Sequence, residues 1–233
     1  MGLKKQMGFF SDVCAQKKPV NYRETPFSFG LIEDVWVAAL ARPDFGNGTL
    51  SNMTYLKEQQ VQTIFGLDTK PMFKGMAWAL EMDYMDVSIP DFTAPDIDLF
   101  ERVYEEIIIQ ASAGKKVAIH CMGGNGRTGT VLAALKLKEL LLVCPSPDAV
   151  TPSLSMVFLP FGVETIFCTE NVKQAVLAIR SIPGNEQAVE TEAQLVSLLK
   201  YEGFLQSNQL GVHAESSSEA LQDSSQMEDR MGL

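Results

Sequence analysis

Short apolar runs alternate with longer segments of helical periodicity through the middle of the chain. Val35–Leu40 and Lys116–His120 are compact apolar runs, and 62–67 and 84–89 have the same texture. Runs of this length that end at proline or glycine are typical of buried β-strands. The segment 56–61 carries residues that favour helix, and it predicts a short helix before the strand expected over 62–67.

Four further segments place apolar residues at the spacing of an amphipathic helix. They cover 97–111, 128–142, 169–179 and 190–204. Thr93, with Asp96 three residues later, resembles a capping box at the start of the first of these helices. Strands that alternate with helices predict an α/β fold with a central, mostly parallel sheet flanked by helices.

The chain has 233 residues, which is enough for one domain of this class. We expect that domain to cover 27–205, after a leader of mixed polarity over 1–26. Within it, about 145–168 contains proline, serine and apolar patches, and we expect an irregular insertion there that is a candidate partner surface. The acidic tail, 206–233, has little to bury and is expected to be disordered.

Composition and charge narrow the classes of function. The chain holds 19 Lys and Arg against 29 Asp and Glu, a net charge of −10, so we expect no nucleic-acid partner. No apolar run approaches the roughly 18 residues of a membrane span. The four cysteines are scattered and only two histidines accompany them, which is typical of a reducing compartment and argues against zinc. We therefore expect a cytoplasmic protein without metal or other cofactor.

One glycine-rich segment connects the apolar run Lys116–His120 to the next predicted helix. It reads HCMGGNGRTG over residues 120–129. The segment matches the dinucleotide pattern G-x-G-x-x-G, but no second strand ending in an acidic residue follows about 20 residues later. A Walker loop is excluded because no lysine precedes Thr128. A tight turn that holds an inert, buried cysteine stays open as a purely structural alternative.

Taken together, the residues of this segment indicate a phosphate site with a nucleophile. Cys121 and Arg127 are separated by five residues, three of them glycine. Such a loop can turn its backbone N–H groups inward at the N-terminus of a helix, where they bind a dianion. The same field stabilises a thiolate, so Cys121 is a candidate nucleophile, and the planar Arg127 side chain matches two phosphate oxygens.

The pattern His-Cys-x5-Arg-Thr-Gly resembles the signature loop of the cysteine-dependent protein phosphatases. With the Gly-Gly pair and the rest of 27–205, the chain looks most like the small atypical dual-specificity phosphatases, including the Cdk-associated type. SIPD at 88–91 and APDI at 94–97 are similar to the segment that holds the family's general acid. Pro183, AVET at 188–191 and Gln194 resemble the stretch that opens its last helix. The resemblance implies the protein-tyrosine-phosphatase-like fold and hydrolysis of phosphomonoesters without a metal.

The resemblance also implies a role for each residue of the site. Cys121 would attack phosphorus and form a phosphocysteine. The phosphoryl oxygens would be held by Met122, Gly123, Gly124, Asn125, Gly126 and Arg127. Asp91 would protonate the leaving oxygen and then act as base for water, and the Thr128 hydroxyl would assist this second step. His120 would lie behind the loop and help to hold the thiolate, or would be a packing residue at the strand end.

Several carboxylates compete for the role of general acid. Asp96 and Asp98 fall in the first turn of a predicted helix, where the helix dipole alone favours them. Asp86 lies within a predicted strand. Asp91 follows Pro90 on a loop that can swing over the phosphate, and the family pattern selects it. We expect Asp91 to be the acid, with Asp96 as the next candidate.

Departures from the family pattern bear on the substrate. The chain has Ile-Pro-Asp in place of Trp-Pro-Asp and lacks the tyrosine-gripping segment of larger relatives, which implies a shallow pocket. The family more often has alanine where Gly123 stands. We expect a phosphatase of phosphorylated proteins that acts on phosphotyrosine and also on phosphoserine and phosphothreonine.

Two other functions stay open. One is a phosphatase of phosphoinositides, inositol phosphates or RNA 5′ ends, although the loop lacks the lysines that phosphoinositide-specific relatives often carry. The other is a phospho-binding module without turnover. The acidic tail also resembles the export tails of some bacterial effectors, so delivery into a host cell is the alternative to a cytoplasmic location.

Overall fold

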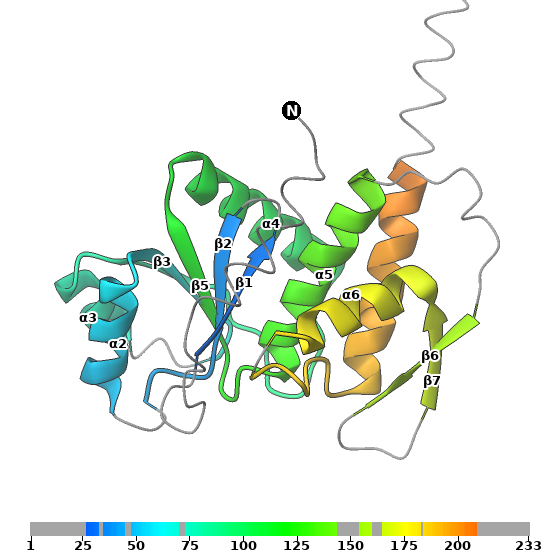
Figure 1. The fold of residues 1–233 in the computed structure, drawn as a ribbon, viewed down its shortest axis with the longest axis horizontal. Helices are drawn as coiled ribbons and strands as arrows, with labels where there is room; N and C mark the ends of the chain where they lie inside the picture. The colour runs from blue at the N-terminus through cyan, green and yellow to red at the C-terminus, as the bar shows by residue number, and fades with distance from the viewer. Residues whose placement is uncertain are drawn as a thin grey trace, which may run out of the picture.

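A five-stranded sheet forms the centre of the molecule (Figure 1). In spatial order its strands are β1 (Phe27–Ile32), β2 (Val35–Leu40), β5 (Lys116–His120), β3 (Val61–Gly66) and β4 (Asp83–Asp86). The last four run parallel to one another, and β1 pairs antiparallel with β2 at one edge. This arrangement confirms the central, mostly parallel sheet that the sequence predicts.

The computed structural model describes residues 27–32, 35–44, 48–69, 73–143, 154–159, 165–182 and 184–208. The expected leader over 1–26 and most of the expected tail, 209–233, lie outside the described residues.

The central strands are apolar along their length because both faces of the sheet are covered. In β2, Val37 and Ala39 join the core on one face, while Ala38 and Leu40 join the core on the other. Successive residues of a strand point to opposite faces, so one short apolar run supplies both cores.

Helices cover the two faces unequally. On one face pack α4 (Ile97–Ser112), α5 (Gly126–Val143), α6 (Glu170–Arg180) and the helix over 192–208. The other face is covered by α2 (Thr49–Glu58) and α3 (Lys74–Ala79). Figure 1 places α2 and α3 on one side of the sheet and α5 and α6 on the other. Among the described residues, no helix is long and apolar enough to cross a membrane.

The start of α4 differs from the expected capping box. The helix begins at Ile97, and Asp96 Oδ1 accepts the hydrogen bond of the Leu99 N–H at 2.8 Å. The Thr93 hydroxyl instead donates to the Pro90 carbonyl at 2.7 Å. The prediction of Thr93 as the capping residue is therefore wrong by three positions. Asp96 is the residue whose side chain accepts a hydrogen bond from a backbone N–H of the first turn.

Other element boundaries also differ from the sequence prediction. The short helix predicted over 56–61 is α2, which begins at Thr49 and ends at Glu58. Gln60 has a positive φ of 65°, which ends the helical conformation and lets Val61 begin β3. The strand β1 and the helix α3 are elements that the sequence analysis did not predict.

The expected insertion is more regular than its sequence indicates. Its described residues form an antiparallel pair, β6 (Leu154–Phe158) and β7 (Thr165–Thr169), while 144–153 and 160–164 lie outside the described residues. Val157 and Cys168 are buried on one face of the pair. The large apolar side chains exposed on it are Met156, Phe158 and Phe167.

The junction of β7 and α6 gives a stability test. The Thr169 Oγ1 accepts from the Val172 N–H at 3.2 Å and donates to the buried Glu202 carboxylate at 2.6 Å. We expect Thr169→Ala to lower the free energy of unfolding by about 2 kcal/mol, because it removes the helix cap and one partner of a buried charge. Urea denaturation measures this, with Thr169→Ser as the control that keeps the hydroxyl. Equal stability of wild type and Thr169→Ala would contradict the assignment.

Candidate active site

The glycine-rich segment forms a loop at the carboxyl end of β5 and leads directly into α5. We call residues 121–127 the CX5R loop. Backbone hydrogen bonds hold its two ends: the Arg42 N–H donates to the Met122 carbonyl at 2.9 Å, and the Gly129 N–H donates to the Asn125 carbonyl at 2.9 Å. The helix α5 begins at Gly126 rather than at the predicted residue 128, so the last two loop residues belong to its first turn.

Glycine is required at one loop position and merely accommodated at another. Gly124 has a φ of +87°, and a Cβ there would lie 2.9 Å from backbone atoms of Leu40 and Ala41. At Gly123 a Cβ would meet nothing within 4 Å. The loop can therefore pack onto β2 only because residue 124 has no side chain, whereas the alanine that the family more often carries at 123 would fit here.

Cys121 points into the loop. Its side chain is buried, and Sγ accepts a hydrogen bond from the Gly124 N–H at 3.2 Å. The sulfur also lies at the N-terminal end of α5, where the helix dipole favours negative charge. A backbone N–H and the positive end of a helix dipole are therefore directed at the sulfur. The role of Cys121 as nucleophile stays a prediction.

Arg127 and Asp91 meet at the same site. Arg127 Nη2 lies 2.7 Å from Asp91 Oδ1, and Arg127 Nη1 donates to the Ile89 carbonyl at 2.9 Å. The Arg127 side chain is only 5% exposed, whereas that of Asp91 is 49% exposed, so the carboxylate lies at the mouth of the site. The loop that carries Asp91 is thus closed over the CX5R loop.

The competing carboxylates lie on other elements. Asp96 caps α4, and Asp98 lies in the first turn of that helix. Asp86, at the end of β4, accepts the hydrogen bond of the Ser88 hydroxyl at 2.5 Å. Of the four aspartates considered from the sequence, Asp91 is the one for which the structure gives an ion pair with Arg127.

His120 lies directly behind the nucleophile and is fully buried. Its Nδ1 lies 3.2 Å from the Cys121 carbonyl oxygen, and its Nε2 lies 3.1 Å from the Tyr84 hydroxyl. A carbonyl can only accept, so Nδ1 carries the proton and Nε2 accepts from Tyr84. Burial lowers the pKa of His120, which favours the neutral ring. The histidine is thus bonded to the backbone at Cys121. The role that the resemblance implies for it stays a prediction.

The hydroxyl of Thr128 is a buried group without a hydrogen-bond partner among the described residues. Thr130, one turn into the same helix, differs because its hydroxyl donates to the Gly126 carbonyl at 2.7 Å. Buried hydroxyls are normally satisfied, so an unsatisfied one directly after Arg127 is consistent with a group that bonds to a species absent from the structure.

One residue of the site received no role from the sequence. Glu190 lies against Gly126, so closely that a Cβ at residue 126 would displace the Glu190 carboxylate. Burial and the charge of Asp91 raise the pKa of Glu190, while Arg127 and the Gly126 N–H act in the opposite direction. Its position in the AVET segment at 188–191 was visible in the sequence, but nothing there indicates that this segment reaches the CX5R loop.

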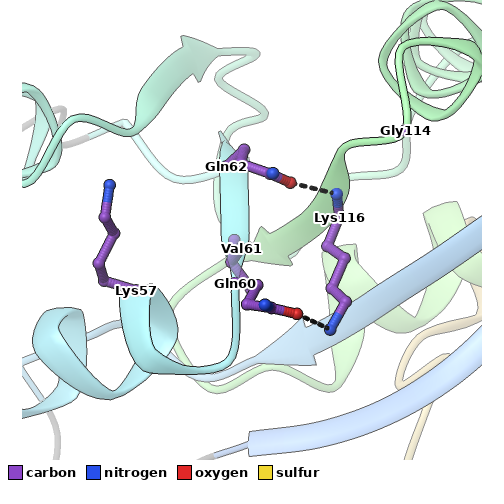
Figure 2. Close-up of a pocket in the computed structure, with 6 residues that line it drawn as sticks. All are labelled: Lys57, Gln60, Val61, Gln62, Gly114 and Lys116. Atoms are coloured by element: carbon purple, nitrogen blue, oxygen red, sulfur yellow. Dashed lines mark hydrogen bonds between the residues drawn. The ribbon is translucent and has the colours of Figure 1, made fainter.

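A separate pocket lies at the other end of the sheet, where β5 begins (Figure 2). It has a volume of about 330 Å³ and is lined by Lys57, Gln60, Val61, Gln62, Gly114 and Lys116. Lys116 is bonded within it: its N–H donates to Gln62 at 2.7 Å and its Nζ to Gln60 at 3.3 Å. None of the sequence-predicted site residues lines this pocket. Nowhere in the described ranges do three or more His, Cys, Asp or Glu side chains form a group that could hold a metal ion.

Comparison with known protein families gives one match to a family model. Residues 38–139 match the model Tc-R-P, described as a polymorphic toxin system DSP-PTPase phosphatase. The matched segment includes the CX5R loop and Asp91.

Two curated proteins are similar over shorter stretches. The uncharacterized protein MJECL20 of Methanocaldococcus jannaschii is 34% identical over 56 residues, which are 24% of this chain and 38% of that protein. The tyrosine-protein phosphatase cdc-14 of Caenorhabditis elegans is 29% identical over 85 residues, which are 36% of this chain and 12% of that protein. The chain therefore spans well under two thirds of the length of either relative.

Solved structures resemble the chain over most of its length. Kinase associated phosphatase, with its catalytic-site cysteine replaced by serine, has a TM-score of 0.58 at 19% identity and covers 78% of this chain and 96% of its own. PTPMT1 in complex with PI(5)P has a TM-score of 0.53 at 16% identity and covers 77% of this chain and 97% of its own. At these identities the likeness establishes the fold, which confirms the fold class expected from the sequence.

The two neighbouring glycines of the CX5R loop provide a matched test. We expect Gly124→Ala to lower the free energy of unfolding by at least about 2 kcal/mol, because a Cβ would force a positive φ and a backbone clash. Gly123→Ala is expected to change it by less than about 0.5 kcal/mol. Urea denaturation of both variants measures the difference, and similar losses for the two would show that the loop is not packed against β2 as described.

The buried state of His120 predicts a pH-dependent stability. Because burial lowers its pKa below the ordinary value of 6.5, the unfolded chain takes up a proton before the folded chain does as the pH falls. The neutral ring contributes its full stabilisation above pH 6.5. As the pH falls from 6.5 to the pKa of the folded state, the free energy of unfolding decreases by at most about 1.4 kcal/mol per pH unit. Unfolding at pH 7.5, 6.5 and 5.5 measures this loss. The His120→Gln variant should lack it, and identical slopes for the two proteins would refute the assignment.

Proposed function

We propose that the chain is a phosphatase of the dual-specificity and protein-tyrosine superfamily and that it dephosphorylates proteins through a phosphocysteine intermediate. The family-model match over residues 38–139 and the shared fold support this proposal. The substrates are phosphotyrosine and, through a shallow pocket, phosphoserine and phosphothreonine. The observation that carries the proposal is the meeting of three groups at one loop: the buried Cys121 thiol, the Arg127 guanidinium and the Asp91 carboxylate. A module that only binds phosphate needs neither the nucleophile nor the acid.

In the first step the Cys121 thiolate attacks phosphorus. The loop N–H groups and Arg127 hold the phosphoryl oxygens, and their charge replaces that of a metal ion. The bond to the leaving oxygen breaks, and Asp91 supplies the proton that this oxygen takes up. The ion pair of Asp91 with Arg127 supports this role, because Arg127 is the side chain proposed to hold the phosphoryl oxygens.

In the second step a water molecule attacks the phosphocysteine and releases inorganic phosphate. The bond between sulfur and phosphorus breaks with its electron pair on Sγ of Cys121. We propose that the Thr128 hydroxyl, which is buried and without a partner among the described residues, bonds to the returning thiolate. Hydrogen bonding to the charged form makes the thiolate a better leaving group.

A phosphoinositide phosphatase is the second candidate. PTPMT1, whose fold the chain shares, has been solved in complex with PI(5)P. Against this candidate, residues 122–126 of the CX5R loop carry no lysine, so the loop offers an inositol phosphate no cation besides Arg127. The absence of lysine favours a protein substrate.

The cellular setting is proposed as the cytoplasm, whether of the producing cell or of a host cell after delivery. The description of the matched family as a polymorphic toxin system supports the second setting. The candidate partner surface within 145–168 corresponds to the β6–β7 pair, whose exposed Met156, Phe158 and Phe167 are suited to bind another apolar surface.

Hydrolysis of p-nitrophenyl phosphate in the presence of a chelator tests the proposed function. We expect turnover by the wild type, none detectable for Cys121→Ser, and a loss of about 10²-fold or more in kcat for Asp91→Asn. Asp98→Asn, on the exposed first turn of α4, is the control and should keep full activity. Phosphopeptides and PI(5)P vesicles offered to the wild type then separate the two candidate substrate classes.

Two results would contradict the proposal. If the wild type binds phosphate yet hydrolyses none of these three substrates, the CX5R loop is a binding site without turnover. Activity that survives in Cys121→Ser would exclude the phosphocysteine route.

A further inference from the structure

The carboxylate of Glu190 is built into the wall of the candidate active site. It lies against Gly126, the first residue of α5 and the last before Arg127. The Gly126 N–H hydrogen bonds to it, and its charge interacts with those of Asp91 and Arg127. Two carboxylates therefore flank the one guanidinium group of the CX5R loop.

The segment that carries Glu190 is fixed by hydrogen bonds on both sides. Gln194 Oε1 accepts from the Glu190 N–H at 2.8 Å and from the Thr191 N–H at 3.3 Å. On the other side the Val189 N–H donates to the Asn125 carbonyl at 3.4 Å, and Val189 holds a φ of +62°. The strained residue and the bonds to the CX5R loop hold the position of the carboxylate.

The two carboxylates differ in what already binds them. Oδ1 of Asp91 accepts from both Arg127 Nη2 at 2.7 Å and the Phe92 N–H at 3.1 Å, and its side chain is 49% exposed. Glu190 is half-buried, and burial together with the charge of Asp91 raises its pKa. A carboxylate with a raised pKa is the stronger base once it is ionised. Asp91 is held by its ion pair with Arg127, whereas Glu190 lies against Gly126 on a segment bonded to the CX5R loop. The two carboxylates therefore reach the site from different elements, and each can serve one of the two proton transfers.

We propose that Glu190 is the general base of the second step, the hydrolysis of the phosphocysteine. This inference rests on the proposed function and assigns to Glu190 a role that the family resemblance gives to Asp91. The water oxygen forms a bond to phosphorus, the bond from phosphorus to Sγ of Cys121 breaks, and the electron pair returns to the thiolate. The water proton passes to the Glu190 carboxylate. Asp91 serves the first step only.

Rapid-quench kinetics with p-nitrophenyl phosphate separate the two steps. We expect Glu190→Gln to keep the initial burst of nitrophenol at the wild-type rate and to lose about 10²-fold in steady-state kcat. Its phosphocysteine should accumulate toward one phosphoryl group per chain, measured by intact mass after acid quench. Asp91→Asn should instead slow the burst itself and accumulate little intermediate.

Glu192→Gln is the matched control, because Glu192 lies two residues after Glu190 and is exposed at the start of the helix over 192–208. It should behave as the wild type in burst and steady state. Glu190→Asp keeps a carboxylate on a shorter side chain, and we expect it to accumulate the intermediate to a smaller extent. This variant carries the test if Glu190→Gln does not fold.

The outcomes distinguish this inference from the proposed function. If the wild type turns over but neither Glu190 variant accumulates phosphocysteine, Glu190 is not the base and the proposed function stands. Accumulation in Asp91→Asn with a normal burst would return the base role to Asp91. If the wild type forms no phosphocysteine and no nitrophenol, the proposed function itself fails.

Discussion

The candidate active site depends on the close approach between the CX5R loop and the backbone of β2. Gly124 packs against Leu40 and Ala41 at distances that exclude a Cβ. This contact fixes the curvature of the loop, and with it the direction of the Gly124 N–H toward Cys121. The helix α5 continues from the same loop, so the alignment of its dipole with the sulfur follows from the same packing.

Charge balance is the second constraint on the site. A guanidinium group as buried as that of Arg127 requires partners, since an unpaired buried charge is strongly destabilising. The Ile89 carbonyl and the Asp91 carboxylate provide them, both from the loop that follows β4. A bound phosphoryl group would also place negative charge beside the Arg127 guanidinium. Closure of the Asp91 loop and binding of the ligand therefore both depend on this one cation.

The sequence predicted those features that depend on local pattern. The apolar run of β2 and the periodicity of α4 identified these elements, and the spacing of Cys121 and Arg127 identified the loop. The capping residue was misassigned because Thr93 and Asp96 both have capping side chains, and only tertiary contacts decide between them. Glu190 was missed because its approach to the CX5R loop depends on how residues about 60 positions apart pack. Such contacts leave no periodic signal in a single sequence.

Arg180 joins two parts of the molecule that the sequence presents as unrelated. Its Nη1 donates to the Phe158 carbonyl at the end of β6, while Nε and Nη2 donate to the Ala188 and Val189 carbonyls beside Glu190. The insertion and one wall of the site therefore share a single anchoring side chain. A change in the length of the insertion that shifts β6 would move the Phe158 carbonyl away from Arg180 and break this hydrogen bond. In related chains the insertion and the residues before the last helix are thus constrained to vary together.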